Sequence, residues 1–178
     1  MKDRHQARLA VIVAVALYVL LPSKLTFGPI WIVPLLVAVL LIPLVALAPT
    51  QLRGVRLMRV LTIALVAVLN FFNVMSVVFL IYDLVNMHAK EHAAVSAIEL
   101  LTYGGLIWTT NVIIFALWYW ELDGDGPFDR ERYPSANDYP SVDFLFPQMQ
   151  IDRTRIKGAP QNWRPMFIDY LYLSFTNA

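Results

Sequence analysis

Polar side chains recur inside two of the most apolar segments of this chain, and their types limit the chemistry that they could do. The candidates are Asn70, Asn73 and Ser76 in the first segment, and Glu99, Tyr103 and Thr110 in the second. Carboxamides and hydroxyls can coordinate ions or join helices by hydrogen bonds, whereas only the carboxylate of Glu99 can also carry a proton near neutral pH. These six residues are therefore predicted to form an intramembrane polar path or a set of packing contacts.

Helical periodicity places each group of polar residues on one face. At about 100° per residue, the polar residues of the first segment fall within an arc of roughly 140°, and those of the second within roughly 120°. Asn111 lies off the second stripe. Because a short loop makes the two segments antiparallel, we expect Glu99 at the depth of Asn73 and Ser76, and Asn70 at the depth of residues 106–110.

Two interpretations of the facing stripes stay open. In the first, the polar residues hydrogen-bond between helices, each bond contributing about 0.6 to 2 kcal/mol. In the second, they line a hydrated path or ion site centred on Glu99, Asn73 and Asn70, with Glu99 as the titratable group.

Other polar patterns do not complete a catalytic or metal site. His88 and His92 are four residues apart with Glu91 between them, but a third histidine or similar ligand is missing. The stretch "ELDGDG", residues 121–126, starts like a calcium loop, but Arg132 stands where such loops need a bidentate glutamate. We interpret it as a solvated turn that ends a helix, and we expect no catalytic residues, no metal and no cofactor.

The whole composition is that of a membrane protein. Of the 178 residues, 58% are hydrophobic and 15% are charged, against about 25% charged in soluble domains. The formal net charge of +1 argues against a nucleic-acid partner. With no cysteine, thiolate chemistry and disulfides are excluded.

Four apolar segments approach or exceed the roughly 20 residues that cross a bilayer. They predict an all-α, polytopic transmembrane bundle with spanning helices at about 8–24, 27–48, 57–82 and 93–120, which together make up a domain of residues 1–122. The second contains Pro29, Pro34 and Pro43, so we expect kinks at its interior prolines. A cleaved signal peptide is the alternative for the first segment, although no small-x-small cleavage site follows it.

Positive charges predict the orientation. Six lie before the first segment or between the second and third, namely Lys2, Arg4, Arg8, Arg53, Arg56 and Arg59. The other two loops carry only Lys24 and Lys90. The rule that positive loops stay inside places the N-terminus in the cytoplasm of a bacterial inner membrane. Residues 118–120, Trp-Tyr-Trp, would form an interfacial aromatic belt.

The last third of the chain is predicted as two parts. Residues 123–165 form a proline-rich cytoplasmic arm, whose stretch "YPSVDFLFPQMQI" is apolar enough to lie on the membrane surface or against the bundle. Residues 166–178 read as the start of a truncated fifth membrane segment, with Trp163, Phe167 and Tyr170 as interfacial anchors.

Three motifs carry a resemblance to a known family: "NVIIFALWYWELDGDGP", "DFLFPQM" and "DYLYLSFTNA". Residues 111–178 resemble a family of bacterial multi-pass inner-membrane proteins, which brings an architecture but no particular activity. The resemblance implies that a further hydrophobic segment follows. "YLYLSFTNA" is also similar to the pore helix of potassium channels, but the filter sequence is absent and the charge count places this segment at the inner surface.

The sequence favours a non-enzymatic function. The leading hypothesis is a channel-like or transport-associated protein whose stripes line a path. The alternatives are an accessory or assembly subunit that uses the stripes for packing and, third, a membrane-embedded enzyme. The expected partners are the lipid bilayer and either further copies of the chain or another membrane subunit.

Overall fold

The computed structural model describes residues 2–46, 52–86, 96–130, 143–150 and 163–178. The regular elements in these residues are all helices, and none of them is a strand. In chain order they are α1 (Lys2–Val19), η1 (Ser23–Leu25), α2 (Ile32–Ala46), α3 (Leu52–Val85), α4 (Ala97–Leu122), η3 (Asp123–Asp125), α5 (Pro127–Arg130), α6 (Pro147–Gln150) and α7 (Phe167–Asn177). The predicted all-α class is confirmed.

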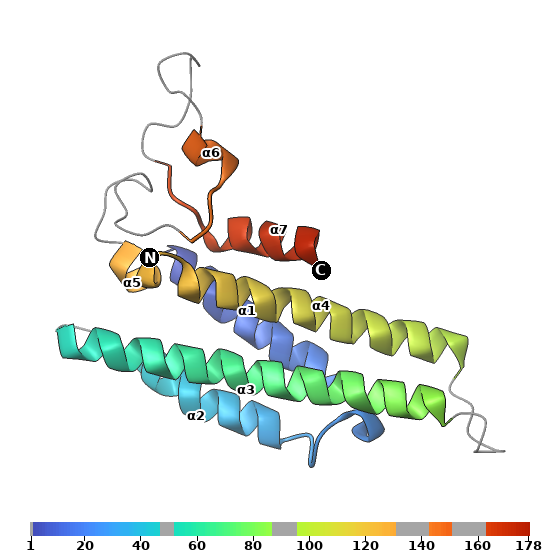
Figure 1. Ribbon diagram of the computed structural model, residues 1–178. Coiled ribbons are helices and arrows are strands. Elements are labelled where there is room, and N and C mark those ends of the chain that lie inside the picture. The colour runs from blue at the N-terminus through green and yellow to red at the C-terminus, as the bar shows by residue number, and fades with distance from the viewer. Residues whose placement is uncertain (1, 47–51, 87–95, 131–142, 151–162) are drawn as a thin grey trace.

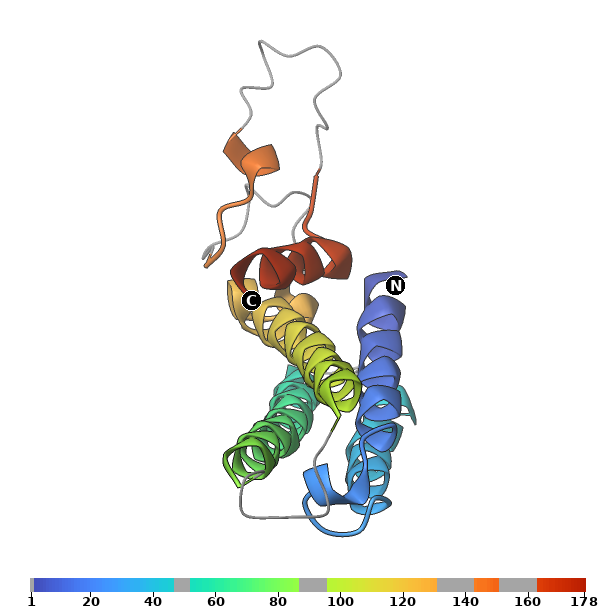
Figure 2. The same ribbon diagram turned by 90° about the vertical axis from the view of Figure 1, so that its right-hand side faces the viewer.

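Helix α4 is the centre of the fold. It packs against α3, α1 and α7, while α2 packs mainly against α3 (Figures 1 and 2). The four long helices alternate in direction, so α1 and α3 begin at the end of the bundle where α4 finishes (Figure 1). We call this the arginine end, because Arg8, Arg59 and Arg130 lie there.

Small side chains let α1 approach its neighbours closely. Its buried face consists of Ala7, Ala10, Val11, Ala14 and Tyr18, which recur every three or four residues. Small residues at such spacing allow two helix backbones to pack tightly. The opposite face of α1 exposes large apolar side chains such as Leu9 and Ile12.

Helix α2 is shorter than its apolar run predicts. It begins at Ile32, so Pro29 precedes it and Pro34 falls in its first turn, where a missing backbone N–H costs little. Gly28 takes a positive φ of 73° in the turn before the helix. Only Pro43 lies in the helix interior, three residues before its last residue, so the kinks expected at several interior prolines reduce to one candidate position.

The third helix starts earlier than predicted, and the fourth is capped at its first turn. Leu52 begins α3, so Arg53 and Arg56 belong to a helix rather than to a loop. The N-cap of α4 is Ser96, whose hydroxyl accepts from the Glu99 N–H while the Glu99 carboxylate accepts from the Ser96 N–H. This capping box satisfies two backbone donors that a helix start leaves free.

Two helices are long and apolar enough to cross a membrane, judged by length and composition. They are Arg56–Val85 in α3 and Ala97–Asp125, which includes α4. The apolar stretches His5–Val19 and Ile32–Leu44 in α1 and α2 are shorter. The described residues therefore provide two candidate crossings, and the four crossings expected from the sequence stay a prediction.

Candidate functional site

One hydrogen bond joins the two helices that carry the polar stripes. Asn73 Nδ2 donates to Asn111 Oδ1 at 3.3 Å, which links the middle of α3 to the middle of α4. Asn73 is buried and Asn111 is half-buried. The helical wheel left Asn111 out because Asn111 lies off the arc of the other polar residues of α4, whereas the face of α4 that meets α3 includes Asn111.

The hydroxyls of the stripes are satisfied within their own helices. Ser76 Oγ donates to the Phe72 carbonyl at 3.1 Å, and Thr110 Oγ1 donates to the Leu106 carbonyl at 2.8 Å. Such bonds to the preceding turn leave no donor free for a neighbouring helix. Asn70 is half-buried, and its carboxamide makes no hydrogen bond with any described residue.

Glu99 and Tyr103 lie at the other end of α4 from the arginine end. Glu99 is exposed and serves the capping box. The ring of Tyr103 lies 6.0 Å from the Lys24 ammonium, which pairs with Asp83 at 3.4 Å. The structure does not bring Glu99 to Asn73.

The shift in register has a simple cause. The partner of Asn73 is Asn111, twelve residues beyond Glu99 and so about 18 Å further along α4. Helix α3 runs past the predicted end at Tyr82 to Val85, and α4 begins at Ala97 rather than Ala93. Both changes move the α4 residues that face Asn73 toward the C-terminus.

A second polar cluster, absent from the sequence prediction, lies where α4 ends. We call it the Asp123 clamp: Asp123, Arg130, Asp143 and Tyr170. Asp123 Oδ1 accepts from the backbone N–H groups of Asp143 and Phe144 at 3.1 and 3.2 Å, and Oδ2 accepts from the Tyr170 hydroxyl at 2.5 Å. In return, Asp143 Oδ2 accepts from the Gly124 N–H at 3.1 Å. One carboxylate thus joins the end of α4 to the arm and to α7.

The turn after α4 depends on backbone conformations that favour glycine. Gly124, Asp125 and Gly126 take φ values of 55°, 62° and 97° in succession. Glycine adopts positive φ without steric cost, and aspartate is among the few other residues that tolerate it. The turn ends the helix and aims the Asp123 carboxylate away from solvent, so that Asp123 is 0% exposed.

Arg130 closes the same helix end from the side of α5. Its Nη2 donates to the Trp120 carbonyl at 2.7 Å and its Nη1 donates to the Asp123 carbonyl. The last carbonyls of a helix lack intrahelical donors and carry partial negative charge, so a guanidinium suits them. The Arg130 guanidinium also lies 5.3 Å from the Tyr170 ring and 5.9 Å from the Trp120 ring.

Aromatic side chains shield the clamp. Phe144 contacts Tyr119 at a ring-centroid distance of 5.0 Å, and Phe146 contacts Tyr170 at 5.3 Å and Trp163 at 5.5 Å. These contacts hold "DFLFPQM", which together with Gln150 is the described part of "YPSVDFLFPQMQI", against the bundle, which is one of the two placements that the sequence left open.

The clamp corrects two sequence interpretations. The turn of residues 121–126 is only partly solvated, because Asp123 is fully buried while Asp125 is exposed and pairs with Arg59 at 3.2 Å. Among the aromatic residues expected at a membrane interface, Trp120, Phe167 and Tyr170 are instead buried within the protein.

Within the described residues, no three acidic or histidine side chains gather as a metal site. His88, Glu91 and His92 lie outside the described residues.

Helix α7 continues from the clamp along the second half of α4. Ser174 Oγ donates to the Val112 carbonyl at 2.7 Å, and the Phe175 ring lies 5.7 Å from that of Trp108. Since Tyr170 lies at the end of α4 and Phe175 lies near its middle, the two helices are antiparallel (Figure 1).

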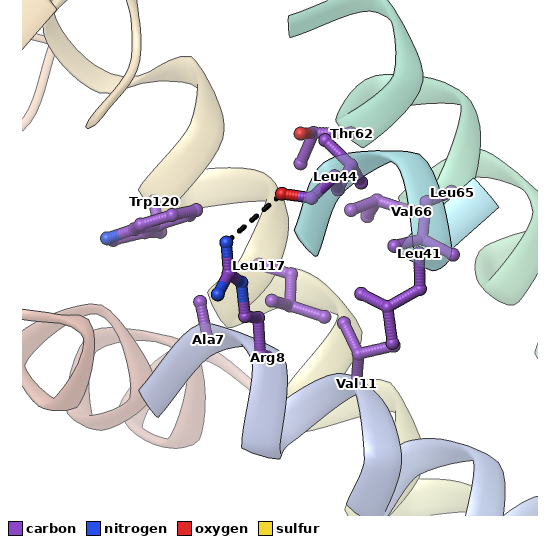
Figure 3. A pocket seen from close by; sticks show the side chains of 10 residues that line it. All are labelled: Ala7, Arg8, Val11, Leu41, Leu44, Thr62, Leu65, Val66, Leu117 and Trp120. Atoms are coloured by element: carbon purple, nitrogen blue, oxygen red, sulfur yellow. Dashed lines mark hydrogen bonds between the residues drawn. The ribbon is translucent and has the colours of Figure 1, made fainter. Parts of the chain in front are cut away.

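The cavities among the described residues have mainly apolar walls. A cavity of about 60 Å³ lies between α1, α2, α3 and α4, and the half-buried Arg8 reaches into it to donate to the Leu44 carbonyl at 3.1 Å (Figure 3). Leu44 lies in the last turn of α2, so Arg8 supplies a donor to one of its free carbonyls. A groove of about 490 Å³ between α4 and α7 is lined almost entirely by apolar atoms, with Trp108 and Phe175 among its residues.

Glu121 is a buried acid outside the hydrogen bonds of the clamp. It is 1% exposed, and neither of its carboxylate oxygens has a hydrogen-bond partner among the described residues. Arg59 and Arg130 lie close enough to attract a negative charge there.

Comparison with protein-family models, curated proteins and solved structures finds no match to this chain. Any role of the Asp123 clamp must therefore be inferred from its geometry. Three of its four residues, Asp123, Asp143 and Tyr170, come from the three distinctive motifs at residues 111–127, 143–149 and 169–178. That shared origin is the sequence signal that could have located it: each motif contributes an aspartate or a tyrosine, and they meet at one helix end.

Proposed function

We propose that this protein is a multi-pass inner-membrane protein with four crossings and a cytoplasmic N-terminus, and that it acts as a non-enzymatic accessory or assembly subunit of a membrane complex. Two helices of spanning length support the membrane placement. Helices α1 and α2 have 18 and 15 residues, so they extend for about 27 and 23 Å against roughly 30 Å of hydrocarbon. Apolar residues such as Phe27, Ile30 and Trp31 extend the second crossing beyond the helix.

The distribution of arginines supports the orientation. Arg8, Arg56 and Arg59 belong to the arginine end, whereas Lys24 lies at the other end beside Asp83. Positive residues near membrane helices favour the cytoplasmic side. Exposed side chains around the bundle, such as Ile12, Val39 and Val78, would contact lipid.

A packing role is supported by one observation above the others: the polar residues that are buried between α3 and α4 bond to protein atoms. The Asn73–Asn111 bond joins the helices, and the hydroxyls of Ser76 and Thr110 donate to carbonyls of their own helices. A hydrated path needs polar groups that face an open passage. The cavities among the described residues have mainly apolar walls, and Glu99 lies at a helix start.

The Asp123 clamp adds to this proposal. A fully buried carboxylate whose two oxygens accept three hydrogen bonds is well suited to fix segments relative to one another. Such a joint would hold residues 143–144 and α7 in a set position at the cytoplasmic face, where a partner subunit would bind.

Reconstitution separates the packing role from the channel-like alternative. Purified wild-type protein and the Asn73→Leu and Glu99→Gln variants are placed in proteoliposomes, and ion flux and thermal unfolding are both measured. The packing role predicts no protein-dependent flux and a lower unfolding temperature for Asn73→Leu, with little change for Glu99→Gln. Flux that is present in wild type and lost in both variants would establish the path instead.

Cysteine labelling tests the orientation, because the natural chain has no cysteine. In intact cells a membrane-impermeant maleimide should react with Lys90→Cys and not with Arg56→Cys. Labelling of position 56 from outside would overturn the proposed orientation.

A further inference from the structure

Two asparagines sit at the centres of the two candidate spans. Asn70 lies at the middle of Arg56–Val85, and Asn111 lies at the middle of Ala97–Asp125. If these helices cross a bilayer as proposed above, both carboxamides lie near its midplane. No water is present at that depth to bond a polar group, and an unsatisfied one costs several kcal/mol.

Both carboxamides keep hydrogen-bonding capacity that the described residues do not use. A carboxamide has two N–H donors and one acceptor oxygen. Asn70 makes no hydrogen bond with a described residue, and Asn111 uses only its Oδ1, in the bond from Asn73. Both residues are half-buried, and neither carboxamide has an atom among the buried, unpartnered polar atoms, so the unused groups reach the surface.

The two asparagines belong to one outer surface. Asn70 precedes Asn73 by three residues, which makes them neighbours on α3, and Asn73 bonds directly to Asn111 on α4. Gly104 lies seven residues before Asn111 and therefore on nearly the same side of α4. A Cβ atom added to Gly104 would meet nothing within 4 Å. We call the surface made by Asn70, Gly104 and Asn111 the α3–α4 face.

We infer that a second copy of this chain covers the α3–α4 face in the membrane, and this inference rests on the membrane placement proposed above. A lipid chain offers no hydrogen-bond partner, whereas a second carboxamide offers both a donor and an acceptor. Two copies related by a two-fold axis present the same groups to each other, so Asn70 and Asn111 of one copy meet those of the other. The open side of Gly104 allows the two backbones to approach closely, as small residues do in membrane helix pairs.

Crosslinking in native membranes tests this contact. Gly104→Cys, in a chain without other cysteines, should form a disulfide-linked dimer of the protein on mild oxidation. Gly105→Cys is the matched control: a Cβ there also meets nothing within 4 Å, but the position is turned about 100° away and should crosslink poorly.

A second variant links the contact to the asparagines. Asn70→Leu removes no hydrogen bond between described residues, so it should leave the protomer folded while weakening self-association about tenfold in a dilution series by fluorescence energy transfer. Thr109→Val is its control. This variant also removes a polar group from the surface of a candidate span, but the exposed Thr109 hydroxyl already donates to the Gly105 carbonyl of its own helix. We expect Thr109→Val to leave the strength of self-association unchanged.

The outcomes separate this inference from the membrane proposal. Protein that resists alkaline carbonate extraction but gives no Gly104→Cys dimer, or links only to a different protein, would overturn the second-copy inference and leave the membrane placement standing. Protein released by carbonate would overturn both.

Discussion

The hydroxyl of Tyr170 donates a 2.5 Å hydrogen bond to Asp123, a residue that precedes it by 47 positions. Both residues are 0% exposed. The bond ties the first turns of α7 to the end of α4, and the Arg130 guanidinium lies over the same tyrosine ring. The position of α7 is therefore set by a polar contact as well as by apolar packing.

Replacing Tyr170 by phenylalanine should loosen α7. The change removes one donor from a buried carboxylate, and hydrogen bonds to charged groups contribute about 1.5–3 kcal/mol. We expect Tyr170→Phe to lower the unfolding temperature in detergent and to make α7 more accessible to proteolysis. Tyr172→Phe is the control, because Tyr172 is 71% exposed and should tolerate the loss of its hydroxyl. Equal stability of the two variants would show that the Asp123–Tyr170 bond contributes nothing.

Gly126 should not accept a side chain. Its φ is 97°, and a Cβ there would lie 3.2 Å from the Glu121 carbonyl oxygen. We expect Gly126→Ala to destabilise the protein by at least about 1–2 kcal/mol, the cost of a left-handed conformation for an L-residue, with the close contact added. Gly105→Ala should instead stabilise it by up to about 1 kcal/mol, because Gly105 lies in a helix with open space at its Cβ position. Thermal unfolding of both variants in the same detergent measures the difference.

Hydrophobic length and periodicity are enough to predict the four long helices, because apolar runs of this size have few alternatives, whereas the short helices α5 and α6 fall in the stretch predicted as an arm. The two best predicted helices, α3 and α4, were placed to within about five residues at each end. The positions of the helix ends determine which polar residues of α3 and α4 lie at the same depth. The capping box at Ser96 and Glu99 starts α4 four residues late, and this shift contributes to pairing Asn73 with Asn111 instead of Glu99.

The clamp could not be predicted from local patterns. Asp123 looked solvated because it stands among glycines and acids, and nothing near it in sequence indicates that Tyr170 and the backbone of Asp143 would bury it. A contact between residues so far apart depends on the path of the arm, which periodicity does not describe. Its one sequence signal is the set of distinctive motifs, which marks the residues without saying that they meet.

The Asn73–Asn111 bond should be a measurable but modest contribution. We expect a double-mutant cycle with Asn73→Leu and Asn111→Leu to give a coupling energy of about 0.6–1.7 kcal/mol, the range found for hydrogen bonds between membrane helices. Unfolding in mixed micelles at a protein concentration that keeps the oligomeric state constant would measure it. A coupling energy near zero would show that the two carboxamides act independently.

Glu121 should be replaceable by an apolar residue without loss of stability. It is 1% exposed, and its carboxylate oxygens accept no hydrogen bond from the described residues, so the protein gains little from this polar group. A buried polar group without a hydrogen-bond partner costs about 1–3 kcal/mol, and an apolar side chain of similar size avoids that cost. We therefore expect Glu121→Leu to keep or raise the unfolding temperature, and Glu121→Gln, which keeps an unpartnered polar group of the same shape, to unfold at a lower temperature than Glu121→Leu. The attraction of Arg59 and Arg130 opposes this effect. If both variants unfold at clearly lower temperature, the charge of Glu121 is held by those arginines and the residue belongs functionally to the Asp123 clamp.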